Sequence, residues 1–198
     1  MRKFALFAAA IAIAGLASFP AVTAEDKKKD DRPDIVVPFV PTKEEVVAAM
    51  LKLAAVKEGE TVYDLGCGDG RITIAAVKDF KAKRGLGIDF NPDRLKDCEK
   101  RVKELKLTED EIKKLTFKQG DVLKMTPEDF KDVDVVTMYL LPDVNLKLRP
   151  ILQKGLKPGA RIVSHDFNMG DWKADKTEMV KVDREHTVYL WTIKEEKK

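Results

Sequence analysis

The stretch Thr61–Val77, TVYDLGCGDGRITIAAV, constrains the fold of this chain more than any other part. A β-branched and aromatic run ends in three glycines, Gly66, Gly68 and Gly70, and an apolar run with helical spacing follows at once. Glycine after a strand lets the backbone turn sharply and approach a ligand, with the N–H groups of the next helix aimed at it. The stretch therefore predicts a strand, a ligand-binding loop and a helix.

Strand-like and helix-like patterns alternate along the chain. The strand patterns are Thr61–Leu65, Gly85–Phe90, Leu115–Gln119, Val133–Leu140 and Arg161–Asp166. The clearest helical pattern between them has Asn91 as its cap and Pro92 in its first turn. Strands that alternate with helices predict a mostly parallel sheet with helices on both faces.

Three local features complete this picture. Two adjacent strand patterns, EMVKV and TVYLWTI, predict an antiparallel hairpin over Glu178–Ile193 at the edge of the sheet. Thr42 followed by Glu45 has the spacing of a capping box at the start of the first helix. Pro150 is expected to kink or split the helical stretch around it, because proline removes a helical hydrogen bond.

The first residues form a different kind of segment. Arg2 and Lys3 precede an uncharged apolar run that extends to Ala24. This order is typical of a secretory signal peptide over Met1–Ala24, so the chain is expected to be exported, to the periplasm or the medium. The alternative is an uncleaved membrane anchor, because the run is just long enough to span a bilayer.

The charged stretch Glu25–Asp34 is expected to be a solvated linker, and Ile35–Lys198 the folded domain. Removal of the leader lowers the formal net charge from +3 to +1. A near-neutral domain with interspersed signs is not the electrostatic signature of a nucleic-acid-binding protein. The sequence does not indicate an oligomeric state.

Cysteine and histidine are scarce. Cys67 lies in the glycine loop and Cys98 in a later helix, and we expect two unpaired thiols, because a disulfide would tie up the loop. The only histidines are His165 and His186. No cluster of Cys and His has the spacing of metal ligands, so no metal site is predicted.

Acidic residues mark the ends of the predicted strands. Asp64 precedes the glycines and Asp69 lies among them, so the loop suits a ligand that carries positive charge better than a pyrophosphate. Asp89 ends the second strand, where an acidic side chain can bind the two hydroxyls of a ribose. Asp121 ends the third strand at the same rim. S-adenosylmethionine has a ribose, an adenine ring and cationic groups.

The segments VYDLGCGDGRI, GLGIDFNP and FKQGDVL resemble successive motifs of class I S-adenosylmethionine-dependent methyltransferases. The resemblance implies their Rossmann-like fold, with the cofactor's methionine and ribose portion over Gly66, Cys67 and Gly68. It also implies that Asp121 and Val122 border the adenine.

The same resemblance places Asp64 near the cofactor's ammonium end and Asp89 at its ribose. Each aspartate also has a purely structural alternative: Asp64 as a turn residue, Asp89 as a helix cap and Asp121 as a loop aspartate.

A narrower resemblance involves PFVPT, MYLLPDVNLKLRP and VSHDFNMGDW, which are similar to segments of small bacterial methyltransferases. These enzymes are in turn similar to the mitochondrial protein-lysine methyltransferases. In that family the stretch that matches PFVPT folds over the cofactor pocket, which implies that Thr42 contacts the cofactor. The resemblance implies N-methylation of a protein lysine.

The ends of the fourth and fifth strands carry the candidate catalytic residues. Tyr139 is either an aromatic wall for the acceptor or a core residue. His165 and Asp166 could accept a proton from an amine or could pair structurally. Two alternatives to a lysine methyltransferase stay open, a small-molecule methyltransferase and an exported relative without catalytic activity.

Overall fold

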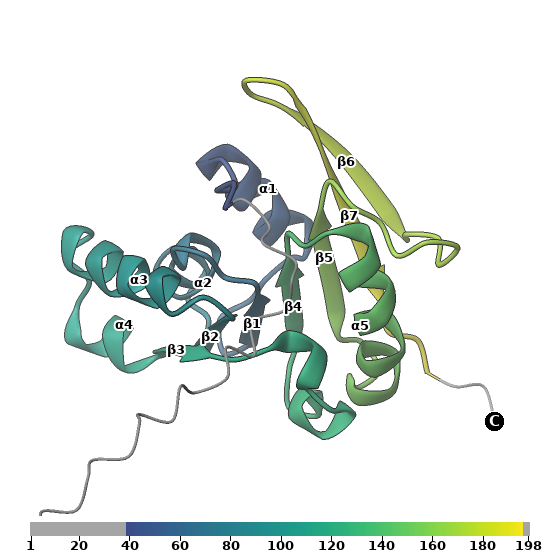
Figure 1. The fold of residues 1–198 in the computed structure, drawn as a ribbon, viewed down its shortest axis with the longest axis horizontal. Coiled ribbons are helices and arrows are strands. Elements are labelled where there is room, and N and C mark those ends of the chain that lie inside the picture. Colours follow the sequence, from purple (N-terminus) through teal and green to yellow (C-terminus); the bar gives the residue numbers. More distant parts are fainter. Residues whose placement is uncertain (1–38, 196–198) are drawn as a thin grey trace, which may run out of the picture. The chain divides into compact units, whose positions relative to one another are not determined.

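The computed structural model describes residues 39–195. The predicted leader, the linker and the start of the domain up to Pro38 lie outside these residues. The described part forms a seven-stranded sheet with helices on both faces (Figure 1). Among residues 39–195, none of the helices combines the length and the apolarity that a bilayer crossing requires.

The strands are β1 (Thr61–Leu65), β2 (Arg84–Asp89), β3 (Leu115–Gln119), β4 (Val135–Met138), β5 (Arg161–His165), β6 (Lys176–Lys181) and β7 (Glu185–Thr192). The helices are α1 (Glu44–Leu53), α2 (Arg71–Lys78), α3 (Pro92–Glu104), α4 (Glu109–Lys113) and α5 (Pro142–Gly155), with two 3₁₀ turns, η1 (Val122–Lys124) and η2 (Pro127–Phe130). The sheet order is β3-β2-β1-β4-β5-β7-β6. The first five strands run parallel, and β7 pairs antiparallel with both β5 and β6. The predicted fold class and the terminal hairpin are confirmed.

Alternation along the central strands divides the core between the two faces of the sheet. In β1, Val62 packs on the face covered by α1 and α2, whereas Leu65 packs on the face covered by α5 and η2. In β4, Val135 and Val136 divide in the same way. Successive side chains of a strand point to opposite faces, so one apolar run supplies both cores.

The start of the first helix differs from the prediction. The helix α1 begins at Glu44, and its N-cap residue is Lys43, which makes no capping hydrogen bond. The predicted capping box of Thr42 and Glu45 is therefore wrong. The hydroxyl of Thr42 instead lies 3.1 Å from Nδ1 of His165, a partner on a distant strand.

The other helix predictions divide. The side chain of Asn91 accepts a hydrogen bond from the backbone N–H of Asp93, so the predicted cap of α3 is confirmed. The helix α5 runs unbroken through Pro150, so the expectation of a split helix is wrong. Leu148 and Leu152 on either side of this proline are fully buried, and their packing offsets the cost of about 3 kcal/mol of an interior proline.

Candidate functional site

The glycine loop joins β1 to α2 at the carboxyl end of the sheet. Gly66, Gly68 and Gly70 have φ angles of 75°, 55° and 75°, in the left-handed region that favours glycine. The N–H groups of Gly66 and Cys67 both donate to the carbonyl of Ile88 at the end of β2, at 2.8 and 3.0 Å. The loop is thus fixed to the neighbouring strand in a conformation that residues with a Cβ rarely adopt.

Two side chains lie directly on this loop. A Cβ placed on Gly66 would lie 2.5 Å from Cδ2 of Leu140, and one placed on Gly68 would lie 2.3 Å from Cε2 of Phe39. The guanidinium of Arg94 lies 4.5 Å from the centre of the Phe39 ring. Phe39 belongs to the segment that was expected to fold over the pocket, and it covers Gly68.

The two cysteines meet behind the loop, and both are free thiols, as predicted. The thiol of Cys98 donates to the carbonyl of Gly68 at 3.1 Å. A hydrogen bond with Cys98 and burial raise the pKa of the Cys67 thiol. Both thiols pack against the loop, and only the backbone of Cys67 is placed to contact a ligand.

Asp89 ends β2 and touches the loop. Its Oδ2 accepts from the N–H of Gly68 at 2.9 Å, and its Oδ1 accepts from the N–H of Asn91 at 2.9 Å. An ionised carboxylate has about four lone-pair sites, so two remain for a ligand. The structural alternative and the ribose prediction are therefore compatible at this residue.

Asp64 lies beneath the loop. Its side chain is 1% exposed and accepts hydrogen bonds from the hydroxyls of Thr137 at 2.9 Å and Thr73 at 3.1 Å. Burial raises the pKa of Asp64 to about 7. No pattern along the chain indicated that two threonines from β4 and α2 would bind this carboxylate.

Asp69 is directed at arginines. Its carboxylate pairs with Arg71 at 2.6 Å and with Arg101 at 3.3 Å. Partial burial acts to raise the pKa of Asp69, but hydrogen bonds and charge from Arg71 outweigh it and lower this pKa. Arg71 also donates to the carbonyl of Thr42 at 2.7 Å. Asp69 was predicted to bind the cofactor, and here its visible role is to tie the loop to the start of α1.

Asp121 and Val122 follow β3, at the same end of the sheet. Oδ1 of Asp121 accepts from the N–H of Leu123 at 2.9 Å and caps the turn η1. Val122 is half-buried against the core below α5. Both residues lie next to the end of β2, as the resemblance implied.

Tyr139, His165 and Asp166 are brought together at the ends of β4 and β5. The rings of Tyr139 and His165 have centres 3.9 Å apart, and the Tyr139 hydroxyl lies 3.4 Å from Oδ2 of Asp166. Arg184 forms an ion pair with this same oxygen.

His165 is nevertheless 1% exposed, and burial lowers its pKa to about 4. Its two nitrogens contact Thr42 and His186, at 3.1 and 2.9 Å. It is therefore not placed to take a proton directly from a ligand amine. The sequence reasoning missed His186 and Arg184, because only the pairing of β7 with β5 brings them here.

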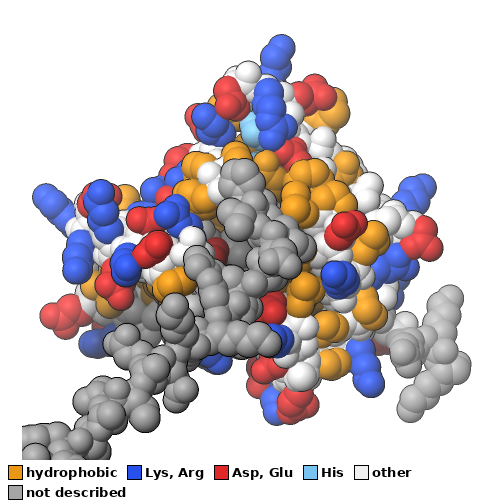
Figure 2. Space-filling model, viewed as in Figure 1, with side chains coloured by type: hydrophobic (Ala, Val, Ile, Leu, Met, Phe, Trp, Pro, Cys, Tyr) orange, Lys and Arg blue, Asp and Glu red, His pale blue; other side chains and the backbone are white. Residues whose placement is uncertain are grey.

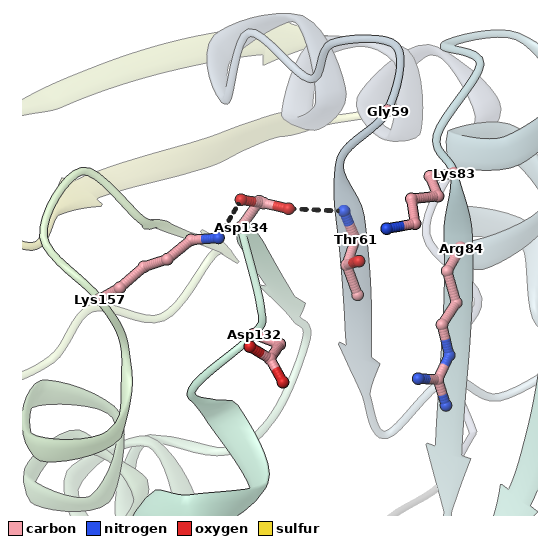
Figure 3. A pocket seen from close by; sticks show the side chains of 7 residues that line it. All are labelled: Gly59, Thr61, Lys83, Arg84, Asp132, Asp134 and Lys157. Carbon is pink, nitrogen blue, oxygen red and sulfur yellow. Dashed lines mark hydrogen bonds and ion pairs between the residues drawn. The ribbon is translucent and has the colours of Figure 1, made fainter.

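A separate pocket of about 540 Å³ lies at the opposite end of the sheet (Figure 3). It is lined by Gly59, Thr61, Lys83, Arg84, Asp132, Asp134 and Lys157. Asp134 is already paired there with the N–H of Thr61 and the amine of Lys157. Open α/β sheets bind ligands at the carboxyl ends of their strands, so the candidate site is the glycine loop and not this pocket.

Comparisons with known proteins agree with this assignment. The family model of the ANTKMT methyltransferase domain matches residues 64–176. A protein-lysine N-methyltransferase of Saccharolobus islandicus is 42% identical over 164 residues, which are 81% of this chain and 96% of that protein. A human lysine N-methyltransferase whose name assigns it to ATP synthase is 28% identical over 141 residues, 71% of this chain and 56% of that protein.

Among solved structures, an RNA methyltransferase from Salinibacter ruber in complex with S-adenosyl-L-homocysteine is 47% identical. It superposes with a TM-score of 0.70 over 80% of this chain and 97% of that one. The glycine loop, open to close backbone approach, fits such a ligand. This chain belongs to the ANTKMT methyltransferase domain family and is an S-adenosylmethionine-dependent methyltransferase.

Proposed function

We propose that the chain transfers the methyl group of S-adenosylmethionine to the side-chain nitrogen of a protein lysine. The observation that carries the proposal is the rim beside the glycine loop, where the half-buried ring of Tyr139 lies next to the carboxylate of Asp166. An aromatic face attracts an alkylammonium by roughly 0.5–2 kcal/mol, and the carboxylate adds to this preference for a cation. Two relatives named as lysine N-methyltransferases support the same acceptor.

The cofactor, when bound, supplies a methyl group on a sulfonium. We assign Gly66 and Gly68 to its close backbone contacts, and the free lone pairs of Asp89 to the ribose hydroxyls. Asp121 and Val122 would border its adenine. Phe39, which covers Gly68, would exclude water from the loop.

Asp64 contributes negative charge below the loop, near the position assigned to the ammonium end. Asp69 and Thr42 act by holding the loop and the segment above it together through Arg71. This network makes them positioning residues.

The leaving group of this reaction needs no proton, so the protein has to orient the acceptor and keep water out. Tyr139 is the residue placed to contact the acceptor. His165 supports the Tyr139 ring from below, and Asp166 accepts from its hydroxyl. The amine loses its proton before transfer, with Asp166 and the Tyr139 hydroxyl as the acceptors at the rim.

RNA is the second candidate acceptor, because the structure from Salinibacter ruber is described as that of an RNA methyltransferase. The surface favours a protein. On the face drawn in Figure 2, basic and acidic side chains are intermixed, and hydrophobic side chains gather between them. A binding face for RNA would instead concentrate positive charge.

The test is to incubate the chain with methyl-labelled S-adenosylmethionine and an extract, then to digest one portion with nuclease and another with protease. We expect the label to survive nuclease and to appear on lysine by mass spectrometry. Label confined to RNA, lipid or small molecules would refute the lysine proposal and leave the methyltransferase assignment intact.

Variants of the tyrosines sharpen this test. Tyr139→Ala is expected to lower turnover by about tenfold, equivalent to about 1.4 kcal/mol, with little change in the affinity for S-adenosylhomocysteine. Tyr189→Ala removes another half-buried tyrosine, on β7, and serves as the matched control. Equal activity of the two variants would contradict the role of Tyr139.

We also propose that the chain is exported after cleavage behind Ala24. The basic, apolar and small-residue order of Met1–Ala24 supports it. Mass spectrometry of the protein from its native cells is expected to find a chain that begins at Glu25. An intact leader in the membrane fraction would favour the anchor instead.

A further inference from the structure

The two histidines of the chain, which are its only ones, meet at one carboxylate. His165 ends β5, Asp166 follows it directly, and His186 lies in the adjacent strand β7. Nε2 of His165 lies 2.9 Å from Nδ1 of His186 and 3.4 Å from Oδ2 of Asp166, and the last two atoms are 3.8 Å apart. Three metal-ligating atoms from three residues thus form one small triangle.

The size of this triangle suits a metal ion. Three atoms at these separations have a common centre about 2.0 Å from each of them, close to the distances at which zinc binds imidazole nitrogen and carboxylate oxygen. We propose that His165, His186 and Asp166 form a binding site for one divalent transition-metal ion of the Zn²⁺ type. Neutral imidazoles with one carboxylate are a donor set that such ions prefer to Mg²⁺ or Ca²⁺.

The outer nitrogens of both imidazoles have partners. Nδ1 of His165 lies 3.1 Å from Oγ1 of Thr42, and Nε2 of His186 lies 2.9 Å from Oδ1 of Asp183. Imidazoles that bind a metal through one nitrogen usually donate the N–H of the other to a carboxylate or a similar acceptor. Both histidines have this arrangement, with the inner nitrogen directed at the common centre.

The carboxylate is held in place by its backbone. Asp166 has a φ of 59°, which is uncommon for a residue other than glycine. Its backbone N–H donates to the carbonyl of Thr187 at 2.6 Å, and its Oδ1 accepts from the N–H of Thr187 at 3.0 Å. Strained backbone of this kind persists where the surroundings fix it, and here it directs Oδ2 toward the two imidazoles.

A cation already pairs with this oxygen. The guanidinium of Arg184 contacts Oδ2 of Asp166, and the Arg184 side chain is 51% exposed in the turn between β6 and β7. A bound metal ion would replace this guanidinium, which is free to turn into solvent. Arg184 therefore competes with the ion, and its removal should strengthen metal binding.

The experiment uses the untagged, metal-free full chain, because a polyhistidine tag would bind the same ions. Titration with Zn²⁺ by calorimetry and metal analysis after dialysis are expected to give one ion per chain. His186→Gln should abolish this binding, and Asp183→Asn, which alters only an outer partner, should weaken it by about 10–100-fold. Arg184→Gln should bind the ion more tightly than the wild type.

Controls keep these outcomes distinct. Asp132→Asn, a carboxylate at the opposite end of the sheet, should bind Zn²⁺ like the wild type. Circular dichroism of each metal-free variant separates lost binding from lost folding. Substitution by Co²⁺ reports the ligands, since a thiolate charge-transfer band would assign the ion to the cysteines instead.

Three results would overturn the proposal: no retained ion, equal binding by wild type and His186→Gln, or a thiolate band. Arg184→Gln with unchanged affinity would overturn the competition. Affinity for S-adenosylhomocysteine is measured in parallel, so failure of the metal site is distinguishable from failure of the methyltransferase site.

Discussion

The carboxylate of Asp89 accepts a hydrogen bond from the backbone N–H of Gly68 at 2.9 Å, and this bond joins the end of β2 to the middle of the glycine loop. The second oxygen of the same carboxylate accepts from Asn91, the cap of α3. One side chain thus fixes the loop, anchors the start of a helix and keeps lone pairs for a ligand. These roles can be separated by experiment.

Asp89→Ala is expected to weaken the binding of S-adenosylhomocysteine by about 1.5–3 kcal/mol, because hydrogen bonds to a charged acceptor are the stronger kind. Calorimetric titration measures this loss, and thermal unfolding measures the effect on folding, which should be modest at a rim position. Asp110→Ala, an exposed carboxylate on α4, is the control. An unchanged affinity together with a large fall in melting temperature would show that Asp89 is only structural.

Gly68→Ala is expected to lower both stability and cofactor affinity. Its φ of 55° costs a residue with a Cβ roughly 1–2 kcal/mol, and the new methyl group would lie 2.3 Å from Phe39. Gly59→Ala is a matched control, because Gly59 has a φ of 86° but no atom within 4 Å of the place that a Cβ would occupy. The difference between the two variants, by urea unfolding and calorimetry, isolates the contact with Phe39. Equal losses in both variants would mean that backbone strain alone matters.

Phe39→Ala is expected to lower the affinity for S-adenosylhomocysteine by about fivefold, close to 1 kcal/mol, through loss of the ring that covers Gly68. The neighbouring Val40, which is exposed, provides the control Val40→Ala. In the double variant with Gly68→Ala, the smaller side chain should recover part of the loss, since residues in contact are coupled. Purely additive losses would contradict the contact.

The fold could be predicted because its signals are local and periodic. The run Thr61–Leu65 and the cap at Asn91 depend on neighbours in the sequence, and both were predicted correctly. The capping box at Thr42 failed because a tertiary partner, His165, attracts the same hydroxyl. Local capping geometry is a weak preference that such a contact outweighs.

The candidate site could be predicted only in part. The aspartates at the strand ends were visible, because parallel strands end at one edge of the sheet. The burial of Asp64 between Thr73 and Thr137 was not visible, since it depends on the register of β1 against β4. The meeting of His165 with His186, 21 residues apart, needs the antiparallel pairing at the edge, which no spacing along the chain reveals.

Asp64→Asn is expected to change how stability depends on pH. Burial raises the pKa of Asp64 from 3.8 to about 7, so between these values the folded protein keeps a proton that the unfolded chain has released. The stabilisation from this proton is complete below about pH 4 and is lost as the pH rises through about 7. It amounts to at most about 4 kcal/mol, at 1.36 kcal/mol per pKa unit.

Asparagine does not titrate, so the stability of Asp64→Asn relative to wild type should rise steadily from about pH 4 to about pH 7. Urea unfolding of both proteins at several pH values in this range measures the difference, in which all other titrating groups cancel. Asp110→Asn, exposed on α4, should keep the wild-type slope. Parallel pH profiles for wild type and Asp64→Asn would mean that Asp64 is already ionised in the folded protein, held so by the hydroxyls of Thr73 and Thr137.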